Sequence, residues 1–241
     1  MKAITKTSPP LDLSNWISAQ ESQADTANYP VTYEEFGRSG FKPSVRQCLE
    51  AEQFGLCGYT CELLQEATRR PNTESHIEHI KPVKVCKTEA GVAYGSIAFD
   101  DLNYFNIIAA TYIRASRSEW YGARYKDDTY TPTLFVSPLI ATCEQKFRYL
   151  VTGDIQPMVS SDSDAIETIR QLKLDHPTLV SARKAEISVH LKSPDATSYS
   201  VTELQKIIDD MKTVDANGRL PNFSFIIQQI AEAFLQVIQS P

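Results

Sequence analysis

The chain has 241 residues, of which 42% are hydrophobic and 22% are charged, as in an ordinary globular protein. Its net charge of −6 excludes a uniformly basic coat for nucleic acid. No apolar run approaches the roughly 18 residues of a membrane span, so the sequence predicts no transmembrane helix. Five cysteines, together with the lack of an apolar signal segment near the start, favour a reducing, cytoplasmic location.

The charge is spread unevenly along the chain. Residues 69–126 carry nine Lys and Arg against six Asp and Glu, whereas residues 160–241 carry eight against eleven. The first of these segments is therefore the basic part of an acidic protein. This asymmetry is a weak indication of a phosphate-bearing partner, and chance variation explains it equally well.

Residues 1–44 indicate an N-terminal arm that packs on the rest of the protein, with a short helix expected at residues 13–19. After Pro43, apolar residues at helical spacing predict a helix that Gly55 ends. A Cys-Gly-Tyr-Thr-Cys stretch follows, and residues 66–74 are then expected to form a polar loop.

A short strand is predicted to end at Pro82, because proline has no N–H to donate to a neighbouring strand. Residues 88–99, with two glycines, predict a connecting loop. The apolar run after Asn106 is compatible with a helix, so Asn106 is interpreted as a cap or a tie for a loop. Two further short strands are predicted around the Gly153-Asp154 turn.

Beyond residue 159 the sequence predicts helices, at residues 164–174 and 177–191 first. Ser200 and Glu203 form a capping box that opens a third helix. His176 and His190 are interpreted as structural. The last helix carries an apolar stripe that is expected to be core or a partner surface, formed by Phe223, Ile227, Ile230, Phe234 and Ile238.

Two of the four histidines lie close together, in the segment Ser-His-Ile-Glu-His-Ile-Lys-Pro at residues 75–82. On a strand, His76 and Glu78 share one face while His79 points to the other. A carboxylate suits a hard cation such as Mg²⁺, and a neutral imidazole can take a proton from water. These are the groups that metal-assisted phosphodiester hydrolysis requires. An ordinary strand with polar surface residues is the alternative interpretation.

Two other stretches carry candidate binding residues. Residues 120–128 combine aromatic, basic and acidic side chains, and Arg124 and Lys126 are candidates for holding phosphate oxygens. A solvated amphipathic turn is the alternative. Cys57 and Cys61 have the spacing of half a zinc site, to which His76 or Cys86 would have to add ligands; buried reduced thiols are the alternative.

These motifs, taken in order, resemble the HNH endonucleases that accompany retrons and Septu-type phage-defence operons, the PtuB-like group. The similarity runs from about residue 47 to residue 158. It implies an α+β fold, mostly helical, with a small ββα-metal (HNH) nuclease core at residues 45–158 and a helical C-terminal region at residues 159–241. The resemblance is carried by C-G-Y-T-C at 57–61, I-E-H-I-K-P at 77–82, Asn106, Y-G-A-R-Y-K at 121–126, S-P-L at 137–139, C-E at 143–144 and G-D-I at 153–155.

The resemblance implies that His79 is the general base that activates water and that Glu78 is a ligand of Mg²⁺ or Mn²⁺. It further implies that Asn106 holds the loop between the second strand and the helix. Lys126 is expected to contact phosphate from the helix, with Arg124 and Lys81 as further substrate-binding residues.

The sequence departs from the family pattern at two places. Gly122 stands where relatives often have a second metal ligand, so His76, Asp127 or Asp128 is the candidate for that role. The second cysteine pair of many relatives is missing, which makes a structural Zn²⁺ on Cys57 and Cys61 an unfavoured expectation.

The resemblance implies an effector nuclease of an antiphage defence system that cuts DNA or RNA. Its implied partners are a PtuA-like ABC-type ATPase and, in retrons, a reverse transcriptase with its RNA–DNA. One alternative is a catalytically degenerate HNH-fold module that binds nucleic acid or the ATPase, with the acidic helical tail as the docking surface. Another is a small zinc protein built on the cysteine pair.

Overall fold

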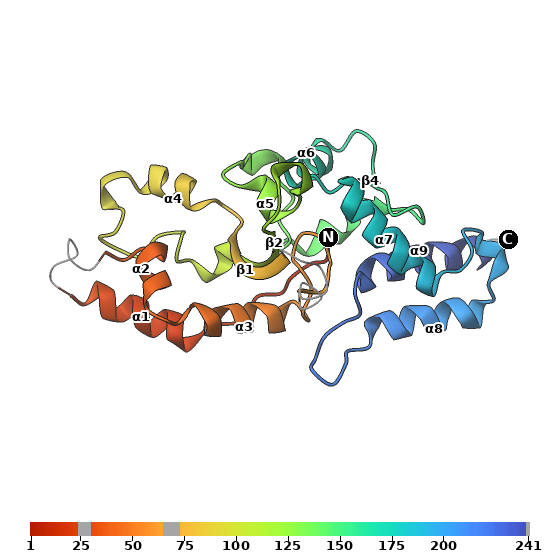
Figure 1. Ribbon diagram of the computed structural model, residues 1–241, viewed down its shortest axis with the longest axis horizontal. Coiled ribbons are helices and arrows are strands. Elements are labelled where there is room, and N and C mark those ends of the chain that lie inside the picture. Colours follow the sequence, from red (N-terminus) through yellow and green to blue (C-terminus); the bar gives the residue numbers. More distant parts are fainter. Residues whose placement is uncertain (24–29, 65–72, 240–241) are drawn as a thin grey trace.

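Two short antiparallel sheets occupy the middle of the molecule, with the N-terminal helices at one end and the C-terminal helices at the other (Figure 1). The computed structural model describes residues 1–23, 30–64 and 73–239. The first sheet pairs β1 (Thr73–His79) with β2 (Ile107–Ile113), and the second pairs β3 (Phe147–Tyr149) with β4 (Ile155–Pro157). The predicted α+β class is confirmed.

The helices largely follow the prediction. Most predicted helices lie within a few residues of their expected bounds, whereas α4 was missed because only Cys86 in it is buried, which leaves no apolar period to recognise. The polar loop predicted at residues 66–74 falls mostly outside the described residues. The helices are α1 (Leu11–Glu21), α2 (Tyr33–Arg38), α3 (Lys42–Glu52), α4 (Val83–Ala90), α5 (Ala123–Lys126), α6 (Ser163–Leu172), α7 (Pro177–His190), α8 (Val201–Lys212) and α9 (Ser224–Gln239).

The register of β1 on β2 sets the position of the polar side chains. Glu78 lies opposite Ile108 and His79 opposite Ile107. Alternate residues of β1 point to opposite faces, so Glu74, His76 and Glu78 form a row on one face. Helix α5 packs against that face, where Lys126 donates a hydrogen bond to Glu78. Helix α3 also contacts the sheet, through β2.

The helix expected after Asn106 is wrong, because residues 107–113 form β2. Six of its seven residues are buried, and four of them are β-branched, a composition that fits a strand buried on both faces. A short, continuous apolar run cannot be told from a buried helix by periodicity alone. Asn106 therefore lies just before the second strand, not between that strand and a helix.

The Cys-Gly-Tyr-Thr-Cys stretch covers the outer edge of β2. The Gln53 amide exchanges two hydrogen bonds of 2.7 Å with the backbone of Ala109, and the Gly58 N–H donates to the same carbonyl. Thr111 N–H donates to Cys57 Sγ at 3.3 Å. A Cβ at Gly58 would lie 2.8 Å from Ile108 Cδ1, so any larger residue would have to displace the end of that side chain. An otherwise open sheet edge is thereby closed.

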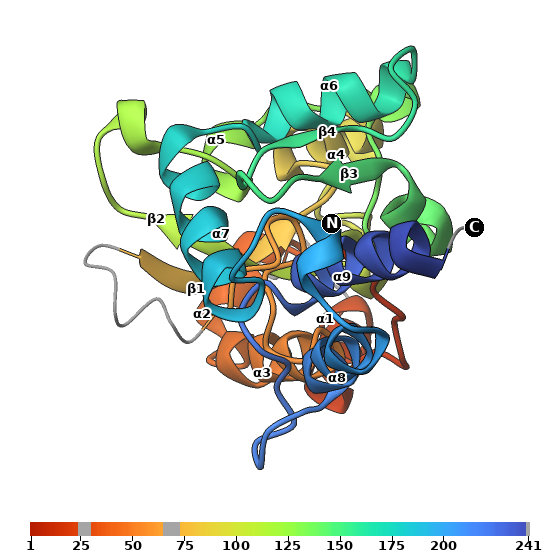
Figure 2. The ribbon, with the colours of Figure 1, turned by 90° about the vertical axis from the view of Figure 1, so that its right-hand side faces the viewer.

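The C-terminal helices enclose the second sheet, which Figure 2 shows between α6 and α9. The predicted turn at Gly153 and the Ser200–Glu203 capping box are both confirmed. The predicted apolar stripe of α9 is core: Phe223, Ile227 and Ile230 are at most 4% exposed, and Phe234 and Ile238 pack against them. The proposal that this stripe is a free docking surface is therefore wrong.

Buried side chains form one continuous cluster from Met1 to Ala231, which includes Trp16 and Phe36 of the N-terminal segment. The boundaries proposed at residues 44 and 158 stay predictions. His176 is structural as expected: its Nδ1 accepts a hydrogen bond from the Thr178 N–H at the start of α7, and its Nε2 donates to the Ser118 carbonyl oxygen. His190 lies beside Glu186. None of the helices in the described ranges is long and apolar enough to cross a lipid bilayer.

Candidate functional site

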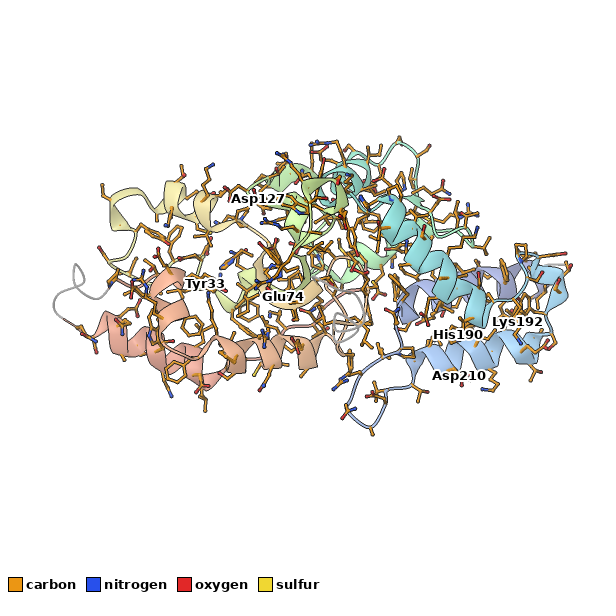
Figure 3. The ribbon with its side chains drawn as sticks, in the orientation of Figure 1. Tyr33, Glu74, Asp127, His190, Lys192 and Asp210 are labelled. Atoms are coloured by element: carbon orange, nitrogen blue, oxygen red, sulfur yellow. The ribbon has the colours of Figure 1, made fainter. Side chains whose placement is uncertain are left out.

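A cavity of about 170 Å³ opens where the end of β1 faces α5. Asp127, which follows α5 and lines this cavity, is labelled in Figure 3, where Glu74 marks the opposite end of β1. The cavity brings together most of the predicted site residues, although Lys126, Lys81 and Asn106 do not line it. Its walls are formed by His76, Glu78, His79, Pro82, Val83, Tyr112, Ala123, Arg124, Asp127 and Asp128.

His79 is fixed in one tautomer by its surroundings. Its side chain is nearly buried, and Nε2 lies 2.9 Å from the backbone carbonyl oxygen of Asp101. A carbonyl oxygen only accepts hydrogen bonds, so Nε2 carries the proton and Nδ1 keeps a lone pair. Burial lowers the pKa of His79 below its ordinary value, which favours the neutral ring at pH 7. The result is an oriented proton acceptor.

The residues that orient His79 were missed by the sequence analysis. The Tyr33 ring meets the His79 ring edge to face, with 4.3 Å between centroids. Asp101 is fully buried, and its Oδ2 accepts hydrogen bonds from the Tyr33 N–H (3.0 Å) and the Tyr94 hydroxyl (2.7 Å). Because these contacts join residues up to 68 positions apart, no local pattern indicates them.

Glu78 is an ionised carboxylate with two different environments. Oε1 accepts a hydrogen bond from Lys126 Nζ at 2.9 Å, and Oε2 lies 3.3 Å from His76 Nε2. Burial by itself raises the pKa of Glu78, but the attraction of Lys126 and His76 outweighs it and the pKa lies below its ordinary value. Oε1 is thus held by Lys126 at 2.9 Å, whereas Oε2 has the longer, 3.3 Å contact with His76.

Lys126 does not contact phosphate in this arrangement, contrary to the prediction. Its side chain is 1% exposed, and Nζ donates to Glu78 Oε1 and to the His79 carbonyl oxygen, both at 2.9 Å. A buried ammonium group requires such partners. Lys126 thus ties α5 to the end of β1 and fixes Glu78, which makes it a structural residue beneath the cavity.

Asn106 and Lys81 hold the loop that follows β1. Asn106 Oδ1 accepts from the Lys81 N–H (2.8 Å), and its Nδ2 donates to the carbonyl oxygens of Lys81 (3.0 Å) and Asp100 (2.8 Å). The Lys81 ammonium group forms ion pairs with Glu89 and Asp100, so it is not directed at a substrate. Asn106 ties a loop as expected, but the loop is the one between the two strands.

Arg124 is held between two aromatic rings. The centre of its guanidinium group lies 3.9 Å from the centroid of the Trp120 ring and 4.8 Å from that of Tyr112. Its Nε is buried without a partner, and no hydrogen bond or ion pair among the described residues uses its guanidinium group. The predicted phosphate-binding role of Arg124 is compatible with this preset position.

The donor set of the cavity fits Mg²⁺ only as an open site. Mg²⁺ is usually held by one or two carboxylates together with water and phosphate. Glu78, Asp127 and Asp128 line one cavity and provide such carboxylates, with His76 beside Glu78. Among the described residues no group of three or more His, Cys, Asp or Glu side chains is arranged to hold a metal ion, so a cation here would rely on one or two carboxylates.

The zinc site proposed at Cys57 and Cys61 does not fit the residues around it. Both thiols are buried, burial raises the pKa of Cys57, and its sulfur already accepts from Thr111. The expected additional ligands lie elsewhere, since His76 contacts Glu78 and Cys86 donates to the Lys81 carbonyl oxygen. Buried reduced thiols that close the edge of β2 explain this motif.

No protein-family model matches this chain, and no curated protein matches it. The PtuB-like resemblance therefore stands on the motifs alone. The functions, partners and cofactor that it implies stay predictions.

The protonation of His79 predicts a pH dependence of stability. Because the folded pKa is lowered, the contribution of His79 is present above its ordinary value of 6.5 and is lost as the pH falls through the folded pKa. Glu78 has its effect only below 4.5. We expect the Tm of the wild-type protein to fall from about pH 7 to about pH 5, and that of His79→Gln to fall less. Parallel curves in thermal circular dichroism would refute a buried neutral His79.

Changing Asn106 to aspartate tests the tie between the loops. The carboxylate would place an oxygen against two carbonyl oxygens that now receive N–H groups, which should cost at least about 2 kcal/mol of unfolding free energy. Asn103→Asp is the exposed control: Asn103 Oδ1 still accepts from the Phe105 N–H, and the change loses only the long, 3.4 Å hydrogen bond from Nδ2 to the Asp100 carboxylate at the surface. Denaturant unfolding measures both, and equal small losses would contradict the proposed tie.

Proposed function

We propose that the protein is a metal-dependent endonuclease of the HNH type that hydrolyses phosphodiester bonds in nucleic acid. The observation that supports it is the neutral, oriented His79, whose Nε2 donates to the Asp101 carbonyl oxygen and which lines one cavity together with Glu78 and Arg124. A general base must be neutral and fixed within reach of its substrate. The lowered pKa of His79 and its hydrogen bond to Asp101 support a neutral, fixed ring, and the reach to a substrate is part of the proposal.

The proposed reaction transfers one proton and exchanges one bond at phosphorus. A water molecule loses a proton to His79 Nδ1 while its oxygen bonds phosphorus, and the bond from phosphorus to the leaving oxygen breaks. The leaving oxygen takes a proton from solvent. Arg124 donates hydrogen bonds to the non-bridging oxygens and sets the phosphate against His79. Glu78, with Asp127 or Asp128, would hold Mg²⁺ or Mn²⁺, which supplies charge neutralisation at the phosphate and the leaving oxygen.

A second candidate is a non-catalytic module of the same fold that binds nucleic acid or an ATPase. The ion pair between Lys126 and Glu78 favours this non-catalytic module, because the Lys126 ammonium group already neutralises the carboxylate that is proposed to bind the cation. The two candidates differ in what remains open: the enzyme needs Glu78 Oε2 to accept a cation while Lys126 keeps Oε1.

The proposed setting, an antiphage system with a PtuA-like ABC-type ATPase and in retrons a reverse transcriptase, follows from the resemblance. The test is to purify the chain alone and together with the product of its neighbouring gene, and to incubate both with DNA and RNA in Mg²⁺. Cleavage that EDTA stops and Mn²⁺ restores supports the enzyme. Binding without cleavage under every condition supports the module.

A further inference from the structure

A second, larger hollow adjoins the first along the polar face of β1. It has a volume of about 570 Å³ and shares His76, Tyr112 and Arg124 with the smaller cavity. The strand rises about 13 Å from Glu78 to Glu74, so the second hollow extends roughly that far along β1 from the first cavity. Its lining residues are Glu74, His76, Tyr112, Ile113, Arg114, Ala115 and Arg124.

The walls of this hollow carry two rings, His76 and Tyr112, and one net positive charge, that of Arg124, which the phosphate of the proposed function would neutralise. His76 and Tyr112 meet edge to face, with ring centroids 4.9 Å apart, and the Arg124 guanidinium group lies between the Tyr112 and Trp120 rings. The Arg114 guanidinium group donates to Glu74 at 2.7 Å, so these two charges neutralise each other. Such a site suits a flat uncharged ring better than a second anion.

Two hydrogen-bonding groups at the boundary of the hollows have no partner. His76 Nδ1 and Arg124 Nε are both buried, and neither bonds any described residue. Nδ1 and Nε are polar atoms that normally find a partner when buried. A ligand that offers both polar edge atoms and a flat face would satisfy them, whereas a purely apolar ligand would not.

We propose that the larger hollow binds one unpaired nucleobase of the strand whose phosphate lies at Arg124, so that the substrate is single-stranded at the cut. A base within a duplex is stacked and paired, and it would have to be extruded to reach this wall. The proposal rests on the proposed function for the position of the phosphate. The binding preference itself does not depend on cleavage.

The experiment measures the dissociation constant of the His79→Ala protein, whose cleavage is expected to be about 10²- to 10⁴-fold slower, for fluorescent oligonucleotides in Mg²⁺. The series comprises a single strand, the same strand in a duplex, and single strands with one abasic site moved along the sequence. We expect the duplex and one or two abasic positions to bind roughly 5- to 150-fold more weakly, the range for loss of one stacked base. The abasic series changes only the ligand, so misfolding cannot produce its result.

Variants at Tyr112 provide the matched pair. Tyr112→Ala should weaken single-strand binding by a similar factor, while Tyr112→Phe keeps the ring and should stay within about threefold of the parent. Equal affinity for single strand and duplex, a flat abasic series, or no binding at all would overturn the subsite. Wild-type cleavage of duplex as fast as single strand would overturn it and leave the nuclease standing. The expected binding pattern without any cleavage by the wild-type protein would support the base-binding subsite and contradict the nuclease activity.

Discussion

Replacing His79 by alanine is expected to slow cleavage at neutral pH by about 10²- to 10⁴-fold, the usual contribution of a positioned general base. The neutral ring of His79 is held by the Asp101 carbonyl oxygen and the Tyr33 ring, whereas His76, the other imidazole lining the cavity, is paired with Glu78. Single-turnover cleavage of a labelled oligonucleotide in Mg²⁺ measures the loss.

The control for this change is His190→Ala. His190 ends α7 far along the molecule from Tyr33 and Asp127, as Figure 3 shows, and its Nε2 lies 3.7 Å from the Glu186 carboxylate. Its removal should leave the rate unchanged. If His79→Ala retained its circular dichroism spectrum and cut as fast as the wild type, His79 would not be the base.

The change Lys126→Met is expected to destabilise the fold by about 3–5 kcal/mol, because it leaves the Glu78 carboxylate buried without its charged partner. For a chain of this length that corresponds to a fall in Tm of roughly 6–20 °C. The loss should be smaller in the double variant with Glu78→Gln, where no uncompensated charge remains. Differential scanning calorimetry of the four proteins of this cycle measures the coupling.

Lys84→Met is the matched control for Lys126→Met. The Lys84 side chain is 75% exposed and lies 3.5 Å from Asp128, itself half exposed, so its loss should change stability by no more than about 0.5 kcal/mol. A Lys126→Met protein as stable as Lys84→Met would show that the ammonium group does not hold Glu78 in solution.

Much of the fold follows from local patterns in the sequence. The alternation from Ser75 to His79 and the stop near Pro82 indicate β1, and the capping box at Ser200 marks the start of α8. His76 and Glu78 meet because residues two apart on a strand share a face. Each of these features depends on residues only a few positions apart, which is why they could be predicted.

The surroundings of the site could not be predicted in the same way. Lys126 meets Glu78 across 48 positions, and the Asp101 carboxylate meets Tyr33 across 68. From the sequence alone, a lysine in a short polar helix is expected to be exposed and able to bind phosphate. Only the packing of α5 on β1 shows that Lys126 is instead paired with Glu78. Residues 107–113 were misassigned because an apolar run of that length suits either a strand or a helix.

The most direct test of the account is an anomalous difference map from crystals grown with Mn²⁺ and an uncleavable single-stranded oligonucleotide. We predict a manganese peak about 2.2 Å from Glu78 Oε2, Lys126 still bonded to Oε1, and a phosphate between Arg124 and His79 Nδ1. A map in which Glu78 contacts only Lys126 and His76, with neither metal nor phosphate in the cavity, would contradict it.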